Sequence, residues 1–259
     1  MAGVVGRYVP PQHGAWAFLG LPVLLAATLV GLSGPVVILS LAWVVAYPWS
    51  YAALGLARSS RPQRFRQPFV VLSAVLVPLV VAALLVRPWL IWAGAVLAAL
   101  FTVNLRYASA NDERALANDA VFVIECSAMV PITWAVAVGD QTWPLPLVGP
   151  VPSSVWVLTI VCTMVLLGST LHVKSLIRER RYRRYSRASR VLAVTAVPVS
   201  MLLATWWGLP SGLWLVAAFV VLAGRAFVVG DRPMRPGRIG MIELSGFVVV
   251  VVAAAFASG

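Results

Sequence analysis

The residues with the clearest chemical potential are the few ionisable side chains placed inside long apolar stretches. Glu125 lies about two helical turns inside one such stretch, and Lys174, the single lysine of the chain, lies near the end of another. Ionisable groups at membrane depth are energetically costly, and they commonly mark ligand, ion or substrate sites. Glu125 and Lys174 are therefore the first candidates for a functional or pocket-lining role.

A cluster of carboxylates and amides precedes Glu125 in the chain. If this segment is helical, Asn111 and Asn118 are seven residues apart, as are Asp112 and Asp119, so that they stack on neighbouring stripes. Oxygen ligands of this kind suit Mg²⁺, which is usually held together with waters and a substrate phosphate. We expect Asp112 and Asp119 to be metal ligands and the two asparagines to bind ligand. The alternative is a solvated loop in which Asp119 caps the next helix.

A basic cluster ends the apolar stretch that contains Lys174. One helical stripe is predicted to carry Lys174, Arg178 and Arg181, and the opposite stripe His172, Ser175 and Glu179. Such a helix could face a phosphate on one side and hydrogen-bond a neighbouring helix on the other. The arginines from Arg180 to Arg190 are most simply explained as a topology signal and an anchor for anionic lipid.

Two further candidates lie near the starts of the first and last apolar stretches. His13 follows Pro10-Pro11-Gln12, and because a lone histidine offers too few ligands for a metal, we expect it to line a polar pocket. Glu243 is expected in the first turn of the last helix, where it would favour the helix dipole. Pairing of Glu243 with Arg225 or Arg178 is the alternative.

The elements that position these residues follow from the composition. Of 259 residues 61% are hydrophobic and 11% are charged, with 20 basic against 8 acidic side chains. A soluble chain carries roughly 25% charged residues, so a soluble enzyme is excluded, and disorder is excluded by the same figures. The basic residues come in short groups between apolar stretches, which favours membrane loops over nucleic-acid binding. We therefore predict an integral membrane protein.

Nine stretches are long enough to span a bilayer, which takes about 17–25 residues each. They are Ala15–Leu32, Pro35–Leu56, Phe69–Val86, Trp89–Leu105, Asp119–Val138, Val155–Ile177, Val191–Gly208, Ser211–Val229 and Ile239–Ala257. With the N-terminus inside, the connections on the cytoplasmic side hold 17 of the Lys and Arg residues and those on the outer side hold one. The positive-inside rule therefore predicts an N-in, C-out topology. We expect an all-α polytopic transmembrane bundle that forms one domain over residues 1–259.

The candidate segments together resemble the YwiC-like family of bacterial integral membrane proteins. The resemblance rests on Pro11-Gln12-His13-Gly14-Ala15-Trp16-Ala17, on Glu113-Arg114 with Asn118-Asp119, on the segment from His172 to Arg180, and on Ile239-Gly240 with Glu243. It implies a location in the bacterial cytoplasmic membrane, and it supplies no activity.

A weaker similarity is to the UbiA-type intramembrane prenyltransferases. These also have nine spans, and they hold Mg²⁺ and a prenyl diphosphate in a cytoplasm-facing cavity between two Asp-rich motifs. Asn111-Asp112 with Asp119 partly matches the first motif, with Ala115 in place of its middle acid. The second motif has aspartates where this chain has Arg178-Glu179-Arg180. The similarity implies Mg²⁺ as cofactor and prenyl transfer as the reaction, with two of the expected acids absent.

Our leading hypothesis is a cytoplasm-facing pocket that binds an anionic, phosphorylated and lipid-linked ligand. Lys174 and Arg178 would neutralise phosphate charge, and Glu125 with the nearby aspartates would hold Mg²⁺ or a polar head group. The alternatives are a non-catalytic transporter, whose sites typically lie at the bilayer midplane, and a membrane assembly or scaffold protein whose charges only fix topology.

Overall fold

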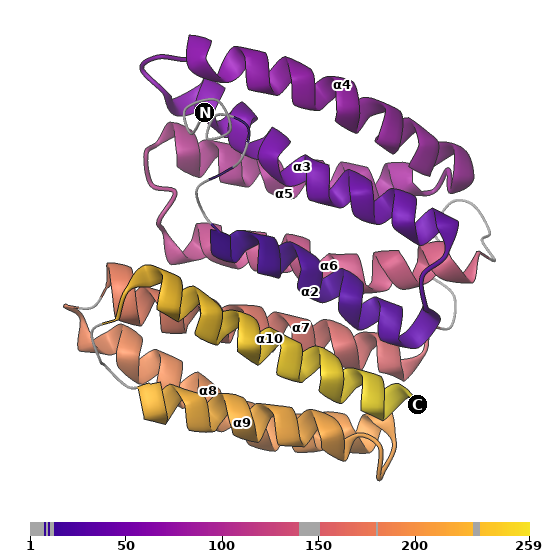
Figure 1. Cartoon of the computed structure of the whole chain (residues 1–259), viewed down its shortest axis with the longest axis vertical. Helices are drawn as coiled ribbons and strands as arrows, with labels where there is room; N and C mark the ends of the chain where they lie inside the picture. Colours follow the sequence, from indigo (N-terminus) through magenta and orange to yellow (C-terminus); the bar gives the residue numbers. More distant parts are fainter. Residues whose placement is uncertain (1–7, 9, 11–12, 140–150, 180, 230–233) are drawn as a thin grey trace. The chain divides into compact units, whose positions relative to one another are not determined.

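The computed structural model describes residues 8, 10, 13–139, 151–179, 181–229 and 234–259, and within these it contains helices and no strand (Figure 1). The first five helices are α2 (His13–Val30), α3 (Gly34–Arg58), α4 (Gln63–Val86), α5 (Leu90–Ser109) and α6 (Leu116–Val138). They are followed by α7 (Ser153–Val173), a short π-helix η2 (Lys174–Arg178), α8 (Arg183–Trp207), α9 (Leu213–Val229) and α10 (Pro236–Ser258). The prediction of an all-α polytopic bundle is confirmed.

Each of the nine predicted spans coincides with a helix of the structure. Seven of the described helices are long and apolar enough to cross a membrane, namely α3, α4, α5, α6, α7 with its π-helical end, α8 and α10. The other two, Gly14–Val30 and Leu213–Val229, are apolar but shorter. At 17 residues, α9 is at about the lower limit for spanning a bilayer. Helix lengths of this kind define a multi-pass membrane protein.

Several of the connections between consecutive helices are short. Three residues separate α2 from α3 and α4 from α5, and five separate α8 from α9. Gly31 ends α2 with a φ of +70°, a left-handed conformation that favours glycine. At the α8–α9 connection the Gly212 N–H donates to the Gly208 carbonyl at 2.9 Å. Short connections of this kind make consecutive helices antiparallel neighbours.

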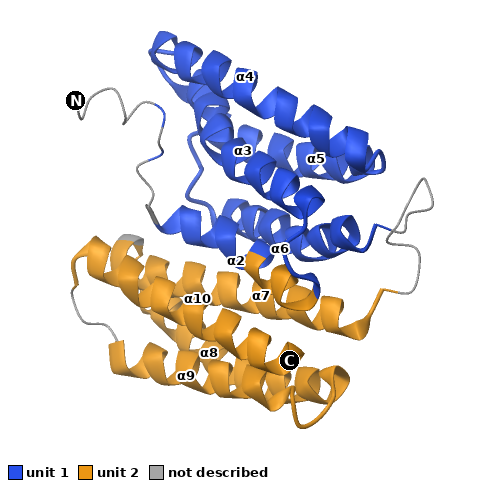
Figure 2. Ribbon diagram, turned by 45° about the vertical axis from the view of Figure 1, so that its right-hand side comes forward, with its two compact units in different colours: residues 1–23, 30–150 blue, residues 24–29, 151–259 orange. Residues whose placement is uncertain are grey.

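The chain forms two compact units, which are coloured separately in Figure 2. Unit 1 comprises residues 1–23 and 30–150, and unit 2 comprises residues 24–29 and 151–259. Within unit 1, a buried apolar cluster joins α3, α4, α5 and α6 through residues such as Leu39, Ala83 and Met129. The prediction of one domain over residues 1–259 stays a prediction, and the two units are described separately below.

The orientation of the helices can be tested with single cysteines at two exposed connections. The native Cys126 and Cys162 are buried and form no disulfide, so they should not react with aqueous reagents. Ser60 and Ser211 are exposed in the α3–α4 and α8–α9 connections. With the N-terminus inside, we expect a membrane-impermeant maleimide to label Ser211→Cys on intact cells and to label Ser60→Cys only after permeabilisation. The opposite labelling pattern would contradict the topology.

Candidate functional site

In unit 1, Glu125 forms a buried polar pair with Asn104. Glu125 lies on α6 and Asn104 on α5, and each residue is 8% exposed. The Asn104 Nδ2 atom donates to Glu125 Oε1 and Oε2, both at 3.0 Å. The Asn104 Oδ1 atom is buried and has no hydrogen-bond partner among the described residues. Sequence reasoning missed Asn104, although an amide inside a predicted span was the signal that could have identified it.

The helical arc predicted for residues 111–125 is broken by a turn. Helix α5 ends at Ser109 and α6 begins at Leu116, so the asparagine and aspartate pairs do not share one helix. Asn111 takes a φ of +56° and ends α5. Its N–H donates to the Ala108 carbonyl, and the next N–H, of Asp112, donates to the Tyr107 carbonyl at 2.9 Å. This hydrogen-bond pattern is a Schellman cap, which explains Asn111 structurally.

The remaining members of this cluster lie in the α5–α6 turn or at the start of α6 in unit 1. Asp112 is exposed in the turn, and Asp119 lies in the first turn of α6. The Asn118 Nδ2 atom donates to the Glu113 carbonyl at 2.9 Å, while the Glu113 carboxylate pairs with Arg58. No group of three or more His, Cys, Asp and Glu side chains that could hold a metal ion occurs in the described part of the chain. A Mg²⁺ site at Asp112 and Asp119 stays a prediction.

The capping role of Asn111 gives a prediction that separates it from a binding role. Asn111→Ala should lower the free energy of unfolding by about 1 kcal/mol, because alanine is disfavoured in the left-handed region, and Asn111→Gly should be neutral or stabilising. Thermal unfolding of the purified variants measures both. Equal stability of the alanine variant and the native protein would contradict the capping role.

In unit 2, the end of α7 winds into a π-helix, which changes the predicted stripes. The Glu179 N–H donates to the Lys174 carbonyl at 2.7 Å, the five-residue spacing of a π-helix. Lys174 and Ser175 are 3% and 7% exposed, so both are buried although they were expected on opposite stripes. Arg181 lies beyond the helix and is exposed. The single basic stripe was wrong because it assumed α-helical spacing throughout.

His172, Glu243 and Arg225 form a buried network between three helices of unit 2. His172 Nδ1 on α7 lies 2.7 Å from Glu243 Oε1 on α10. Arg225 Nη1 on α9 lies 3.0 Å from Glu243 Oε2. The predicted hydrogen bond from the His172 stripe to a neighbouring helix and the pairing of Glu243 with Arg225 are therefore confirmed.

Several polar atoms of this network have no hydrogen-bond partner among the described residues. They are His172 Nε2, Arg225 Nε and Nη1, and Glu243 Oε2. Arg225 and Glu243 are thus close enough to form an ion pair, but the angles between their atoms are not those of a hydrogen bond. Buried polar groups are normally hydrogen-bonded, so these donors and acceptors can bind a polar group of a ligand.

The positions of Glu243 and Gly246 on α10 explain how the network fits together. Glu243 is the eighth residue of a helix that begins at Pro236, so its expected place in the first turn was wrong. The helix begins earlier because proline is well suited to the first helical position. A Cβ added at Gly246 would lie 2.9 Å from Arg225 Nη1 and 2.9 Å from Leu222 Cδ2. Glycine at position 246 therefore leaves the space that Arg225 occupies.

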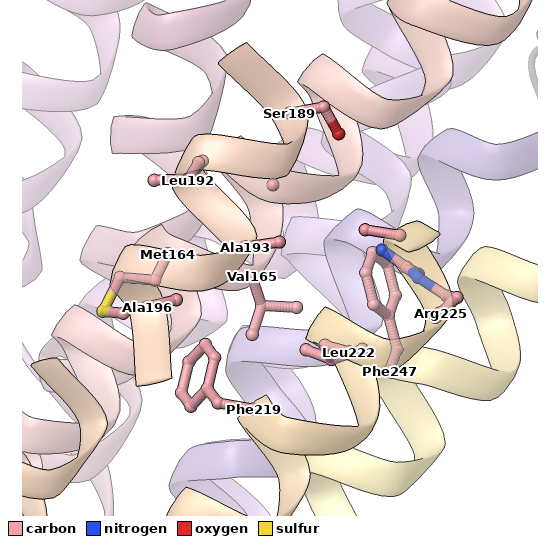
Figure 3. Close-up of a pocket in the computed structure, with 12 residues that line it drawn as sticks. Met164, Val165, Ser189, Leu192, Ala193, Ala196, Phe219, Leu222, Arg225 and Phe247 are labelled. Atoms are coloured by element: carbon pink, nitrogen blue, oxygen red, sulfur yellow. The ribbon is translucent and has the colours of Figure 1, made fainter. Parts of the chain in front are cut away.

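Arg225 also lines a recess inside unit 2, shown in Figure 3. The recess is narrow, with a cavity volume of about 30 Å³. Its lining comes from α7, α8, α9 and α10 and consists of Met164, Val165, Gly168, Ser189, Leu192, Ala193, Ala196, Phe219, Leu222, Arg225, Ala226 and Phe247. Apart from Arg225 and Ser189 this lining is apolar, so Arg225 provides its one charge.

The predicted site residues are divided between the two units. Asn111, Asp112, Asn118, Asp119 and Glu125 belong to unit 1, as does His13, and His172, Lys174, Ser175, Arg178 and Glu179 belong to unit 2. The side chains of His13 and Arg178 lie outside what the structure describes. Arg225 was not among the predicted ligand-binding residues, although an arginine inside an apolar stretch was the available signal.

The apolar helices and the buried charged networks define a multi-pass membrane protein. Comparison with known proteins shows which family the chain resembles. Residues 9–134 match the model of the YwiC-like protein family. The chain is also 27% identical over 240 residues to the uncharacterized protein YwiC of Bacillus subtilis. This alignment covers 91% of this chain and 92% of that protein. These matches confirm the resemblance to the YwiC-like family.

No solved structure matches the chain. The further similarity to the UbiA-type prenyltransferases stays a prediction.

Proposed function

We propose that unit 2 binds the anionic, phosphate-bearing head of a lipid-linked ligand, with Arg225 as the principal contact. The observation that carries this proposal is the placement of the Arg225 guanidinium. It lines a largely apolar recess, and its Nε and Nη1 atoms have no hydrogen-bond acceptor among the described residues. A ligand phosphate would supply these acceptors.

The chemistry of arginine favours a phosphate at this position. A guanidinium presents its N–H groups in a planar fork that matches the oxygens of phosphate, and such charge-assisted bonds are stronger than neutral ones. Glu243 Oε2 lies 3.0 Å from Nη1 and fixes the position of the guanidinium. Residues 151–259 carry 12 basic and 3 acidic side chains, so the surroundings also attract an anion.

Lys174 is a second buried cation of unit 2, 3% exposed, in the π-helix that follows α7. A buried ammonium can neutralise phosphate charge as a point charge while the guanidinium fixes its orientation. In the predicted N-in topology this end of unit 2 faces the cytoplasm, and the ligand would reach it from the bacterial cytoplasmic membrane.

The proposal concerns binding, and transfer of the prenyl group stays a separate prediction. Transfer of the UbiA type would add Mg²⁺ to ionise a diphosphate. The acids with which we predicted this metal, Asp112 and Asp119, belong to unit 1 and not to the network around Arg225. A scaffold protein without a ligand is the competing function.

The experiment is thermal unfolding of the purified protein in a neutral detergent, with farnesyl diphosphate or farnesol added. We expect farnesyl diphosphate to raise the melting temperature of the native protein and farnesol to leave it unchanged. Arg225→Gln should abolish the increase, and Arg225→Lys, which keeps the charge but loses the fork, should reduce it. Arg238 is exposed at the same end of unit 2, so Arg238→Gln is the matched control and should keep the full increase.

Two results would contradict the proposal. One is the absence of any increase with farnesyl diphosphate in the native protein. The other is an equal increase in Arg225→Gln and Arg238→Gln, which would assign the effect to general charge. Either result would leave a scaffold role as the better explanation of unit 2.

A further inference from the structure

We propose that unit 1 contains a second, independent binding site for a membrane-soluble amphiphile with one apolar chain and a protonated primary amine as its head group. The site combines an apolar recess between α3, α4, α5 and α6 with the Asn104–Glu125 pair. It uses none of the residues proposed to bind phosphate in unit 2.

The recess has the lining of a site for an apolar chain. It has a cavity volume of about 210 Å³ and opens to the surroundings. The side chains that carry the argument are Leu39, Trp43, Trp49, Leu97, Met129 and Ile132, and the whole lining is apolar.

The Asn104–Glu125 pair continues the two helix faces that line the recess. Met129 follows Glu125 by four residues on α6, so the two side chains lie on the same face one turn apart. Leu97 precedes Asn104 by seven residues on α5, which is also the same face. Between them, the Phe101 ring packs on the lining residue Trp49 with ring centroids 5.9 Å apart. An apolar chain in the recess would therefore lead to the polar pair.

The charge of the pair selects the head group. Glu125 is 8% exposed, and within the described part of the chain its carboxylate accepts hydrogen bonds from the neutral Asn104 amide. In the described part of the chain no cationic side chain lies within ion-pair distance of Glu125. A buried carboxylate without a cation is costly, and the unpartnered Asn104 Oδ1 adds a second acceptor.

A primary ammonium supplies both a positive charge for the carboxylate and a donor for the second acceptor. It carries one positive charge and three N–H donors, so it can bond a Glu125 oxygen and Asn104 Oδ1 at the same time. An alcohol brings one donor and no charge, and a phosphate head would bring further negative charge to a carboxylate that has no arginine beside it, unlike Glu243. We therefore expect selectivity for long-chain amines over long-chain alcohols.

The test is saturable binding of radiolabelled dodecylamine to the full chain in nanodiscs of phosphatidylcholine, after subtraction of binding to empty nanodiscs. The native protein should bind one molecule, and excess dodecanol or farnesyl diphosphate should not displace it. Glu125→Gln should weaken binding at least about tenfold, because a buried charged partner is lost. Glu113→Gln is the matched control, since this acid of unit 1 pairs with Arg58 and does not line the recess, and it should bind normally.

A second variant tests the recess without changing the polar pair. Leu97→Trp would fill the recess and should also weaken binding, which keeps the proposal testable if Glu125→Gln does not fold. The melting temperature of each variant checks its folding. No saturable binding to the native protein, unchanged affinity in folded Glu125→Gln or Leu97→Trp, or an equal loss in Glu113→Gln would overturn the proposal. Because farnesyl diphosphate tests unit 2 and dodecylamine tests unit 1, the two proposals can fail separately.

Discussion

Glu243→Ala is expected to lower the free energy of unfolding by about 3–5 kcal/mol, because removing one partner of a buried ion pair leaves an uncompensated charge. Glu243 is 5% exposed, and it contacts both His172 and Arg225. Its loss would remove an acceptor from two neighbouring helices at once. Unfolding of the purified protein, followed by circular dichroism during denaturant titration, measures the change.

The matched control for this variant is Glu113→Ala. Glu113 also pairs with an arginine, Arg58, but the two side chains are 31% and 25% exposed. Partly exposed pairs contribute at most about 1 kcal/mol, so this variant should be much milder. If Glu243→Ala and Glu113→Ala unfold at the same denaturant concentration, Glu243 does not hold a buried charge network.

Gly212→Ala is expected to destabilise the protein by about 3 kcal/mol, because the α8–α9 connection has no room for a side chain. A Cβ at this position would lie 2.5 Å from the Ala204 carbonyl oxygen and 2.7 Å from Ala204 Cα. Both contacts are with backbone atoms, so the clash can be relieved only by moving one helix against the other. Thermal unfolding of the variant measures the cost.

Gly224 on α9 supplies the comparison for Gly212. A Cβ added at Gly224 meets no heavy atom within 4 Å. Since alanine is the better helix former, Gly224→Ala should be neutral or stabilising by up to about 1 kcal/mol. Equal melting temperatures for the two alanine variants would contradict the close approach of α8 and α9 at this connection.

The helices could be predicted from the sequence because the apolar stretches of a membrane protein have a length fixed by the bilayer. Helix α4, for example, ends at Val86 as predicted, where Arg87-Pro88 interrupts the apolar pattern. The predicted start of the same helix was six residues late, since the structure begins it at Gln63 and the prediction at Phe69. Polar residues outside the apolar stretch can continue a helix, and hydropathy alone does not detect this.

The candidate sites could be predicted only in part, because a pattern within one helix does not specify partners on another. Glu125 and Lys174 were identified by their cost inside apolar stretches, and both are buried. Asn104 and Arg225 gain their importance from neighbours on α6 and α10, which are 21 and 18 residues away in sequence. The π-helix after Val173 depends on a five-residue hydrogen-bond spacing that no residue type marks.

The most direct test of phosphate binding in unit 2 is the nitrogen-15 resonance of the Arg225 side chain. In protein with labelled arginine, the Nε signal of Arg225 is assigned as the one missing from Arg225→Lys. We predict that dodecyl phosphate shifts this Nε signal, since the N–H gains an acceptor that it lacks among the described residues, and that dodecanol does not. An Arg225 signal that stays in place at saturating dodecyl phosphate would contradict the assignment of this arginine as the phosphate contact.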